Sequence, residues 1–489
     1  MSKLRKQGLS ALMWDFLGKI SSQGVGFIVT VILARLLEPS DFGLVAMIMV
    51  VVGMAQVFTD IGLGGALIQK QNVTQAHYSS VFYFNILVAS CLSSITFFSA
   101  CVIANFFNNE KLTPLIEVIS FLFILTALGS VQTIKLRKHL KYSFISKINF
   151  AAAALSGVVG VVCALYNAGV WSLVAQILTH SICNSFALWL TAGWRPSLVF
   201  SFKALNQLWS FGFRLFLSRL LESIFSRIDY LIIGKLFSAD TLGFFQRAKQ
   251  FNLLVIQYTS GSLMSVMFPV LSQIQNDLPR FQNVVAKTFH LLCFIVFFLL
   301  GGLYLVSEEL IVFLYSEKWL PSVKYMQLLL LSAFAYPLSA LLVNIFSSRG
   351  NSKLLLKLEI IKKFIHSLNL FNAIYFGIEF YLYGLIFVSL LNFMLNVHFA
   401  AKEIDLSANG FYLPFFYQLV LCVVAVLTTL LVSGAIEPSY LEGFFLKGSL
   451  FVILFASSNF ILKTSTFQEV ANFVVPLISK YIRKNNASY

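Results

Sequence analysis

The chain has 489 residues, of which 58% are hydrophobic and only 11% are charged, and its mean hydropathy is +0.83. A soluble domain carries about 25% charged residues, so this composition excludes an ordinary soluble protein and indicates an integral membrane protein. The formal net charge of +15 does not point to nucleic acid, because basic residues gather in the cytoplasmic loops of membrane proteins.

Apolar runs of roughly 20 residues recur along the chain, and each is long enough to cross a hydrocarbon core of about 30 Å as a helix. The alternating pattern of an outer-membrane barrel strand does not occur. We therefore expect an all-α membrane protein. In chain order, fourteen transmembrane helices are predicted at 12–34, 42–66, 79–104, 114–134, 148–166, 170–192, 208–233, 241–266, 288–306, 322–346, 358–376, 381–400, 414–433 and 444–462.

Lysine and arginine set the orientation of these helices, because they collect on the cytoplasmic side. With a cytoplasmic N-terminus, 23 of the 35 basic residues fall in cytoplasmic segments and six on the opposite side. The remaining six lie within spans. This asymmetry predicts that both termini are cytoplasmic. The tail at 466–489 mixes apolar and basic residues, which is typical of an amphipathic segment on the membrane surface.

An internal repeat relates the two halves of the chain at an offset of 200 residues. It is visible in VILARLLEPSDFGL at 31–44 and LIIGKLFSADTLGF at 231–244, where Gly43 matches Gly243. Two copies of six helices enter the membrane in the same direction, as parallel repeats of transporters do. We predict two parallel six-helix lobes at 1–195 and 196–403, two additional helices at 404–465, and the cytoplasmic tail at 466–489.

Polar residues follow one face of each of the first two predicted helices. On helix 12–34 they recur at helical spacing from Asp15, and on helix 42–66 at i, i+3, i+7 and i+11 from Gly53. The residues of these faces that we select as candidates are Asp15, Lys19, Gln23, Gln56 and Asp60.

The first two helices of the second copy are polar as well. Helix 208–233 carries an unusual number of charges for a span, and helix 241–266 carries a stripe of glutamines. Two cations, Arg247 and Lys249, lie near the outer end of helix 241–266, and Arg247 is a candidate. The candidates on these two helices are Arg214, Arg219, Glu222, Arg227, Asp229, Arg247, Gln250 and Gln257. The repeat places Lys19 of the first copy at the position of Arg219 in the second.

Charges are not tolerated against lipid, so these four helix faces must meet each other or water. We expect a central cavity lined by the four helices. Its intramembrane cations, which are Lys19, Arg214, Arg219, Arg227, Arg247 and Lys249, outnumber its acids. A cationic cavity predicts an anionic substrate such as a phosphate. Alternatively, pairs such as Asp15–Lys19 are structural salt bridges, or Asp15, Asp60, Glu222 and Asp229 couple a driving ion.

The sequence shows no motif for catalysis. GxxxxGK[ST], HExxH and GxSxG are missing, and the six cysteines lack metal-type spacing. Glu308 and Glu309 form an adjacent acidic pair, which we expect to be solvated. We therefore expect neither an enzyme nor a cofactor or metal.

Three segments resemble the polysaccharide transporter family. They are ARLLEPSDFGLVAM at 34–47, FTDIGLGGALIQK at 58–70 and RIDYLIIGKLFSADTLGFFQRA at 227–248. This family comprises the Wzx-type flippases of the MOP superfamily, and the likeness is strongest to its colanic-acid and teichuronic-acid exporter branch. The resemblance extends over nearly the whole chain.

The resemblance implies an inner-membrane flippase that moves undecaprenyl-diphosphate-linked oligosaccharide from the cytoplasmic to the periplasmic leaflet by alternating access. It implies that cavity cations bind the diphosphate, a role for Lys19, Arg219 and Arg227 with Arg214 and Arg247 behind them. The partners implied are this substrate, membrane lipids and the polysaccharide polymerase machinery, without nucleic acid. Two alternatives remain open, a multidrug or cation antiporter of the same superfamily and a membrane-embedded polysaccharide polymerase or ligase.

Overall fold

The computed structural model describes residues 2–256, 259, 262–436, 439–462, 464 and 467, and these are built from helices and their connections without any strand. Contacts divide the chain into two compact units, Met1–Gly243 and Phe244–Tyr489. The expected all-α architecture is confirmed. The predicted tail at 466–489 lies outside the described residues, apart from position 467.

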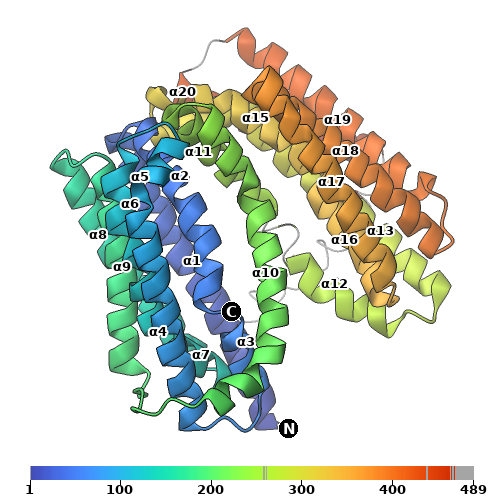
Figure 1. Cartoon of the computed structure of the whole chain (residues 1–489). Coiled ribbons are helices and arrows are strands. Elements are labelled where there is room, and N and C mark those ends of the chain that lie inside the picture. Colours follow the sequence, from blue (N-terminus) through green and yellow to red (C-terminus); the bar gives the residue numbers. More distant parts are fainter. Residues whose placement is uncertain are drawn as a thin grey trace, which may run out of the picture. The chain divides into compact units, whose positions relative to one another are not determined.

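The first unit contains the helices up to α10 and the start of α11 (Figure 1). The elements are α1 (Ser2–Leu36), α2 (Pro39–Ala55), the 3₁₀ helix η1 (Gln56–Thr59), α3 (Leu63–Gln69), α4 (Gln75–Phe98), α5 (Ala100–Phe106), α6 (Leu112–Ser120), α7 (Leu122–Lys138), α8 (Tyr142–Leu165), α9 (Val170–Thr191) and α10 (Phe202–Leu236).

The second unit contains most of α11 and the helices that follow it. They are α11 (Ala239–Ile256), α12 (Ser262–Gln273), α13 (Leu278–Leu305), α14 (Ser307–Tyr315), the short η3 (Glu317–Trp319), α15 (Pro321–Ala333), α16 (Ala335–Ser348), α17 (Ser352–Phe376), α18 (Ile378–Glu403), α19 (Asn409–Gly434) and α20 (Tyr440–Ile461). Within this unit α18 packs against α15, α16 and α17, while α19 packs against α13 and α20.

Among the described residues, eleven helical segments are long and apolar enough to cross a membrane. The other three predicted spans correspond to α10, to α11 with α12, and to α17, which are helical but do not meet that criterion. Charged residues within α10 and α17 lower their hydropathy. The count of fourteen spans therefore stays a prediction.

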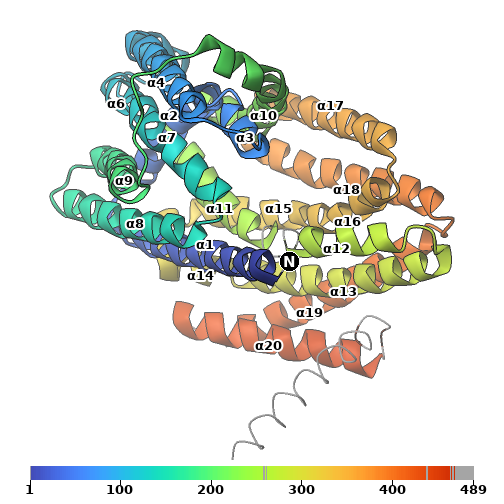
Figure 2. The same ribbon diagram turned by 90° about the horizontal axis from the view of Figure 1, so that it is seen from below.

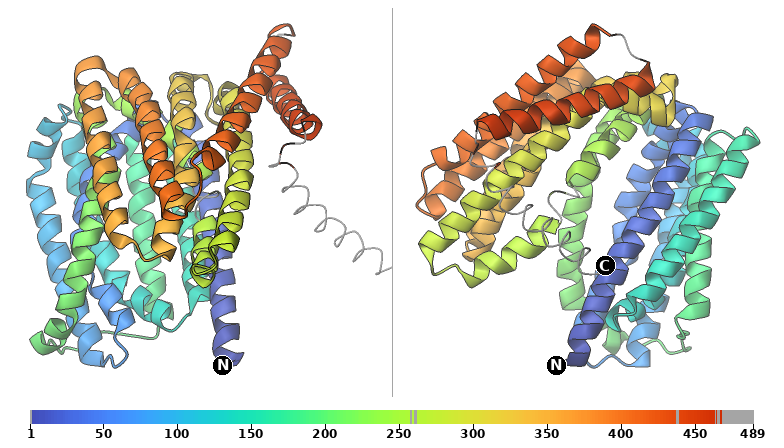
Figure 3. Two further views of the ribbon diagram at one scale, coloured as in Figure 1. Left: turned by 90° about the vertical axis from the view of Figure 1, so that its right-hand side faces the viewer. Right: turned by 180° about the vertical axis from the view of Figure 1, so that it is seen from behind.

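Two sets of contacts organise the first unit. α1 runs along α8, and α8 along α9, as Figures 2 and 3 show. A separate apolar core joins α3, α4, α7 and α10 through side chains such as Leu67, Phe82, Val131 and Leu208. This core fixes the N-terminal half of α10 against the first unit.

We predicted α10 as the first helix of the second lobe, yet its contacts place it in the unit that ends at Gly243. A helix can belong to one copy of the repeat and still pack on the other copy. The contacts of α10 therefore do not test its place in the repeat. The lobes at 1–195 and 196–403 stay a prediction.

The predicted continuous helix at 42–66 is interrupted in the structure. α2 ends at Ala55, η1 follows, and the chain turns at Ile61 and Gly62, whose φ angles are +39° and +72°. Gly62 packs so closely on Gly212 that a β-carbon would lie 2.1 Å from the Gly212 carbonyl oxygen. Apolar periodicity does not reveal this turn, because a single close backbone contact determines it.

Candidate functional site

Three charged residues and two serines of α10 lie on one helical face that borders a cavity. Arg219, Glu222, Ser223, Ser226 and Arg227 recur at i, i+3, i+4, i+7 and i+8, which places them on the same side of an α-helix. All five line a cavity of about 350 Å³ within the first unit. Arg219, Glu222 and Arg227, which are unusual in a membrane span, thus lie where α10 borders this cavity.

The opposite wall comes from the end of α2 and from η1. Gly53, Gln56, Val57 and Asp60 line the cavity, again at intervals of three and four residues. The backbone between α2 and α3 changes from α to 3₁₀ geometry and then to a left-handed turn at this wall. Irregular backbone at membrane depth is tolerated where it is buried in protein or lines a water-filled cavity.

An ion pair links the two walls. Arg219 Nη1 lies 3.3 Å from Asp60 Oδ2, and their side chains are 50% and 31% exposed. The other Asp60 oxygen, Oδ1, accepts a hydrogen bond of 2.8 Å from the Gly64 backbone N–H at the start of α3. Asp60 therefore caps α3 and holds a half-exposed guanidinium, so the position of Arg219 is tied to the helix break.

The second arginine lies directly on the backbone of α2. Arg227 Nη1 donates to the Met49 carbonyl oxygen at 3.1 Å, and Ser223 Oγ donates to the Gly53 carbonyl oxygen at 3.3 Å. A β-carbon on Gly53 would lie 2.1 Å from the guanidinium carbon of Arg227. Glycine at position 53 is thus what lets the arginine approach α2.

Glu222 completes the charges of the cavity. Its side chain is exposed, and in the described part of the chain no hydrogen bond or ion pair holds it. The positive charges of Arg219 and Arg227 are formally balanced by the negative charges of Asp60 and Glu222 in this cavity. The cationic excess that we predicted for the larger four-helix cavity is therefore not present in this part of it.

The remaining candidates of the first unit lie elsewhere. Lys19 Nζ pairs with Asp15 Oδ2 at 2.6 Å, which is the structural alternative left open above. Arg214 turns back along its own helix and donates from Nε to the Ser210 carbonyl oxygen at 3.0 Å. These residues, with the exposed Gln23 and the buried Asp229, do not line the cavity.

The candidates on α11 belong to the second unit. Arg247 is buried and donates from Nη1 to Gln250 Oε1 at 2.9 Å. Gln257 lies outside the described residues. The shared cavity of four helices stays a prediction; the cavity described above is lined by α2, η1 and α10.

Four cavity residues were not among the sequence candidates, namely Gly53, Val57, Ser223 and Ser226. Their spacing of three or four residues from Gln56, Asp60, Glu222 and Arg227 was a usable signal. Their small size or lack of charge kept them from being selected. Where charged residues crowd one helix face, the small residues between them determine how closely the opposite helix approaches.

The expectation that Glu308 and Glu309 are both solvated was wrong for Glu309. This residue is only 5% exposed, and its Oε1 forms an ion pair with Lys447 Nζ of α20. Five apolar residues follow the glutamates, but no local pattern shows that a lysine 138 positions later lies nearby.

The family of the chain follows from comparison with known proteins. Residues 32–324 match the family model described as polysaccharide biosynthesis protein. The chain belongs to this family. The matched region contains the whole cavity described above, and the resemblance inferred from the sequence is confirmed.

Curated relatives extend the match over most of the chain. The teichuronic acid biosynthesis protein TuaB of Bacillus subtilis is 25% identical over 84% of this chain and 86% of its own length. The lipopolysaccharide biosynthesis protein WzxC of Escherichia coli is 23% identical over 70% of each chain. The succinoglycan biosynthesis transport protein ExoT of Rhizobium meliloti is 25% identical over 63% of this chain.

Solved structures show the fold. The lipid II flippase MurJ, in an inward closed conformation, matches with a TM-score of 0.69 and 16% identity over 92% of this chain and 100% of its own. An inward-facing multidrug resistance MATE family transporter of the MOP superfamily matches with a TM-score of 0.52 and 12% identity over 79% of this chain. By family the chain is a polysaccharide biosynthesis protein, and its multi-pass helical fold is similar to those of the lipid II flippase and of the MATE family transporter.

Proposed function

We propose that the chain is a flippase that moves undecaprenyl-diphosphate-linked oligosaccharide from the cytoplasmic to the periplasmic leaflet of the inner membrane by alternating access. In this proposal both termini are cytoplasmic and the repeat-related lobes move about a central site. The polysaccharide polymerase machinery uses the product. The names of TuaB, WzxC and ExoT support a substrate from surface-polysaccharide synthesis.

One observation carries the proposal, namely two arginines on one face of α10 that border a cavity at a break in the opposing helix. Guanidinium groups bind phosphate oxygens through paired N–H donors, and such charge-assisted hydrogen bonds are roughly twice as strong as neutral ones. Arg219 and Arg227 are two helical turns apart, about 12 Å along the axis. We assign the diphosphate to this pair, with Lys19, Arg214 and Arg247 as further cations along the route.

The ion pair between Arg219 and Asp60 suggests how substrate and driving ion are coupled. A diphosphate competes with Asp60 for the Arg219 guanidinium, because both offer anionic oxygens. When the diphosphate binds, Asp60 is released to take up a proton or a cation. Glu222 is the second acid at this wall, and Asp15 and Asp229 remain candidates for the same role on α1 and α10. Gln56, Gln250 of α11 and Gln257 would contact polar parts of the substrate.

Complementation tests the proposal directly. The gene is expressed in a strain that lacks its own flippase but still makes the lipid-linked repeat unit, and surface polymer is measured. Wild-type protein should restore the polymer, whereas Arg219→Ala and Arg227→Ala should fail although the protein is present in the membrane. Arg280→Ala, on an exposed residue of α13, is the matched control and should restore the polymer.

The same assay separates the alternatives. Normal polymer in the Arg219→Ala, Arg227→Ala double variant would contradict the assigned site. Resistance to aromatic cations without any restored polymer would favour the antiporter. Polymer that grows in vitro from lipid-linked units in the presence of the purified chain alone would favour a polymerase.

A further inference from the structure

A second and larger cavity lies within the first unit. In the predicted topology it lies at the external ends of α2 and α10. Its volume is about 700 Å³. Four segments line it, at 40–47, 107–111, 167–170 and 235–240. Each lies in or directly after a connection from an odd-numbered predicted span to the next, so all four lie on the external side in the predicted orientation. Lys235 is about 12 Å beyond Arg227 along α10.

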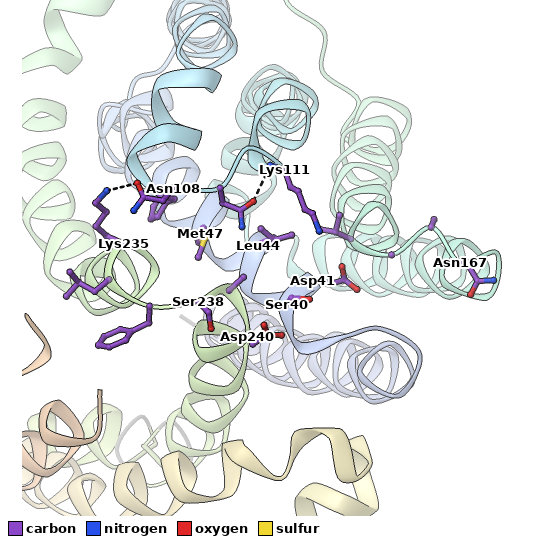
Figure 4. Close-up of a pocket in the computed structure, with 18 residues that line it drawn as sticks. Ser40, Asp41, Leu44, Met47, Asn108, Lys111, Asn167, Lys235, Ser238 and Asp240 are labelled. Carbon is purple, nitrogen blue, oxygen red and sulfur yellow. Dashed lines mark hydrogen bonds between the residues drawn. The ribbon is translucent and has the colours of Figure 1, made fainter. Parts of the chain in front are cut away.

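The outer cavity carries two ammonium groups and two carboxylates, so its formal charge is balanced. Figure 4 shows Lys111 and Lys235 along one side and Asp41 and Asp240 along the other. No guanidinium is among the described residues that line this cavity, so the paired N–H donors assigned to the diphosphate at Arg219 and Arg227 are lacking here. The arrangement instead offers strong acceptors and strong donors a short distance apart.

Uncharged hydrogen-bonding groups fill the space between the charges. Asn108, Asn109 and Asn167, which carry amides, and Ser40 and Ser238, which carry hydroxyls, are among the residues that line the cavity. Asn108 and Asn167 have φ angles of +54° and +60°, which hold them at the tips of their loops. Asn167 makes no side-chain hydrogen bond to any part of the chain that the structure describes.

Several of these groups are held in place before any ligand arrives. The Glu38 backbone N–H donates to Asp41 Oδ2 at 3.1 Å. Lys235 Nζ donates to Asn108 Oδ1 at 3.4 Å and lies 5.0 Å from the centre of the Phe106 ring. Fixed polar groups lower the entropy cost of binding a ligand.

We propose that the outer cavity binds the glycan of the lipid-linked substrate on the external side. This inference rests on the proposed function. Sugar hydroxyls donate and accept at once, so they pair with carboxylate, amide and ammonium groups in a single site. The partly buried ring of Phe237 supplies an apolar surface for a sugar face. The volume falls within the range of small-molecule sites, about 300–1,000 Å³, and fits a short oligosaccharide.

The test uses a glycan without lipid or diphosphate. Fragments of one to three repeat units are released by mild acid from the strain's own surface polysaccharide. Their binding to the purified full chain is measured by saturation-transfer NMR and calorimetry. The Asn108→Gly, Asn167→Gly double variant removes two amides at positions where glycine adopts the observed φ angles without strain. Its affinity should fall at least about tenfold. Asp405→Gly, at another left-handed position with φ of +49° in the second unit, should bind as wild type.

Equal binding by the double variant and wild type would overturn the inference, as would the absence of any fragment binding by a wild-type chain that complements. Arg219→Ala should lose export but keep fragment binding, which separates the two sites. If the fragments bind but complementation fails, the proposed function is wrong and the outer glycan site stands. If the double variant instead loses binding to phosphatidylethanolamine in nanodiscs, the cavity takes a lipid headgroup and the glycan assignment is wrong.

Discussion

Gly43 and Gly243, two hundred residues apart in the chain, make reciprocal contacts between the first turns of α2 and α11. A β-carbon on Gly43 would lie 1.8 Å from the Ala239 carbonyl oxygen, and one on Gly243 would lie 2.1 Å from the Pro39 carbonyl oxygen. Each glycine thus packs on the residue four positions before the other. The reciprocity supports the internal repeat, because equivalent positions of the two copies meet.

This contact predicts that neither glycine tolerates a side chain. Gly43→Ala places a methyl group against backbone atoms that cannot move aside independently, and such overpacking costs about 1–3 kcal/mol of unfolding free energy. We expect a lower Tm in detergent and less protein in the membrane, with the same result for Gly243→Ala. Gly24→Ala on α1, where nothing lies within 4 Å, is the control and should leave Tm unchanged or raise it slightly. An unchanged Tm for Gly43→Ala would contradict the close approach.

Gly53→Ala should behave differently, because the obstacle is the mobile end of a side chain. The new methyl group displaces the Arg227 guanidinium and breaks its hydrogen bond to the Met49 carbonyl oxygen. We expect a Tm within a few degrees of wild type but at least a tenfold loss of polymer export. The measurement is the complementation assay together with thermal unfolding. Gly26→Ala, with open space around it, is the matched control for function.

The two roles of Asp60 can be separated by substitution. Asp60→Asn keeps an oxygen that accepts from the Gly64 N–H but removes the charge that pairs with Arg219. Export should fall at least tenfold while Tm is retained. Asp60→Ala loses the cap of α3 as well, which costs about 1 kcal/mol more. Thermal unfolding of the two variants in parallel measures that difference. Full export by Asp60→Asn would show that its charge has no part in transport.

The buried ion pair of the second unit predicts a large effect on stability. Lys447→Met leaves Glu309 as an unpaired charge, and Glu309 Oε2 is buried without a hydrogen bond to any described residue. Breaking such a pair costs about 3–5 kcal/mol. Lys324→Met breaks a half-exposed pair with Glu379, where water screens the charges, and should leave Tm close to that of the wild type.

A double-mutant cycle checks the interpretation of that pair. Adding Glu309→Gln to Lys447→Met removes the unpaired charge, so the double variant should unfold at a higher temperature than Lys447→Met alone. A double variant that is destabilised by the sum of both single changes would show that the two side chains do not interact.

The sequence by itself determined the class of the protein, its helices and the polar face of each helix. Hydrophobicity and a period of 3.6 residues are local properties, so they place Arg219, Glu222 and Arg227 on one side of α10 without knowledge of any other segment. Short motifs were also sufficient for the family, which the match over residues 32–324 confirmed.

Only the tertiary structure decided which faces meet. It paired Arg219 with Asp60 across 159 positions, packed α1 on α8, and placed Lys447 against Glu309. It also introduced the turn at Gly62 where the periodicity predicts an unbroken helix. The physical reason is that a helical period specifies the direction of a side chain but not its partner, which depends on how closely two backbones approach. At this site Gly53 and Gly62 permit the close approach, and the position of a glycine on a helix face does not show which residue of another helix it will meet.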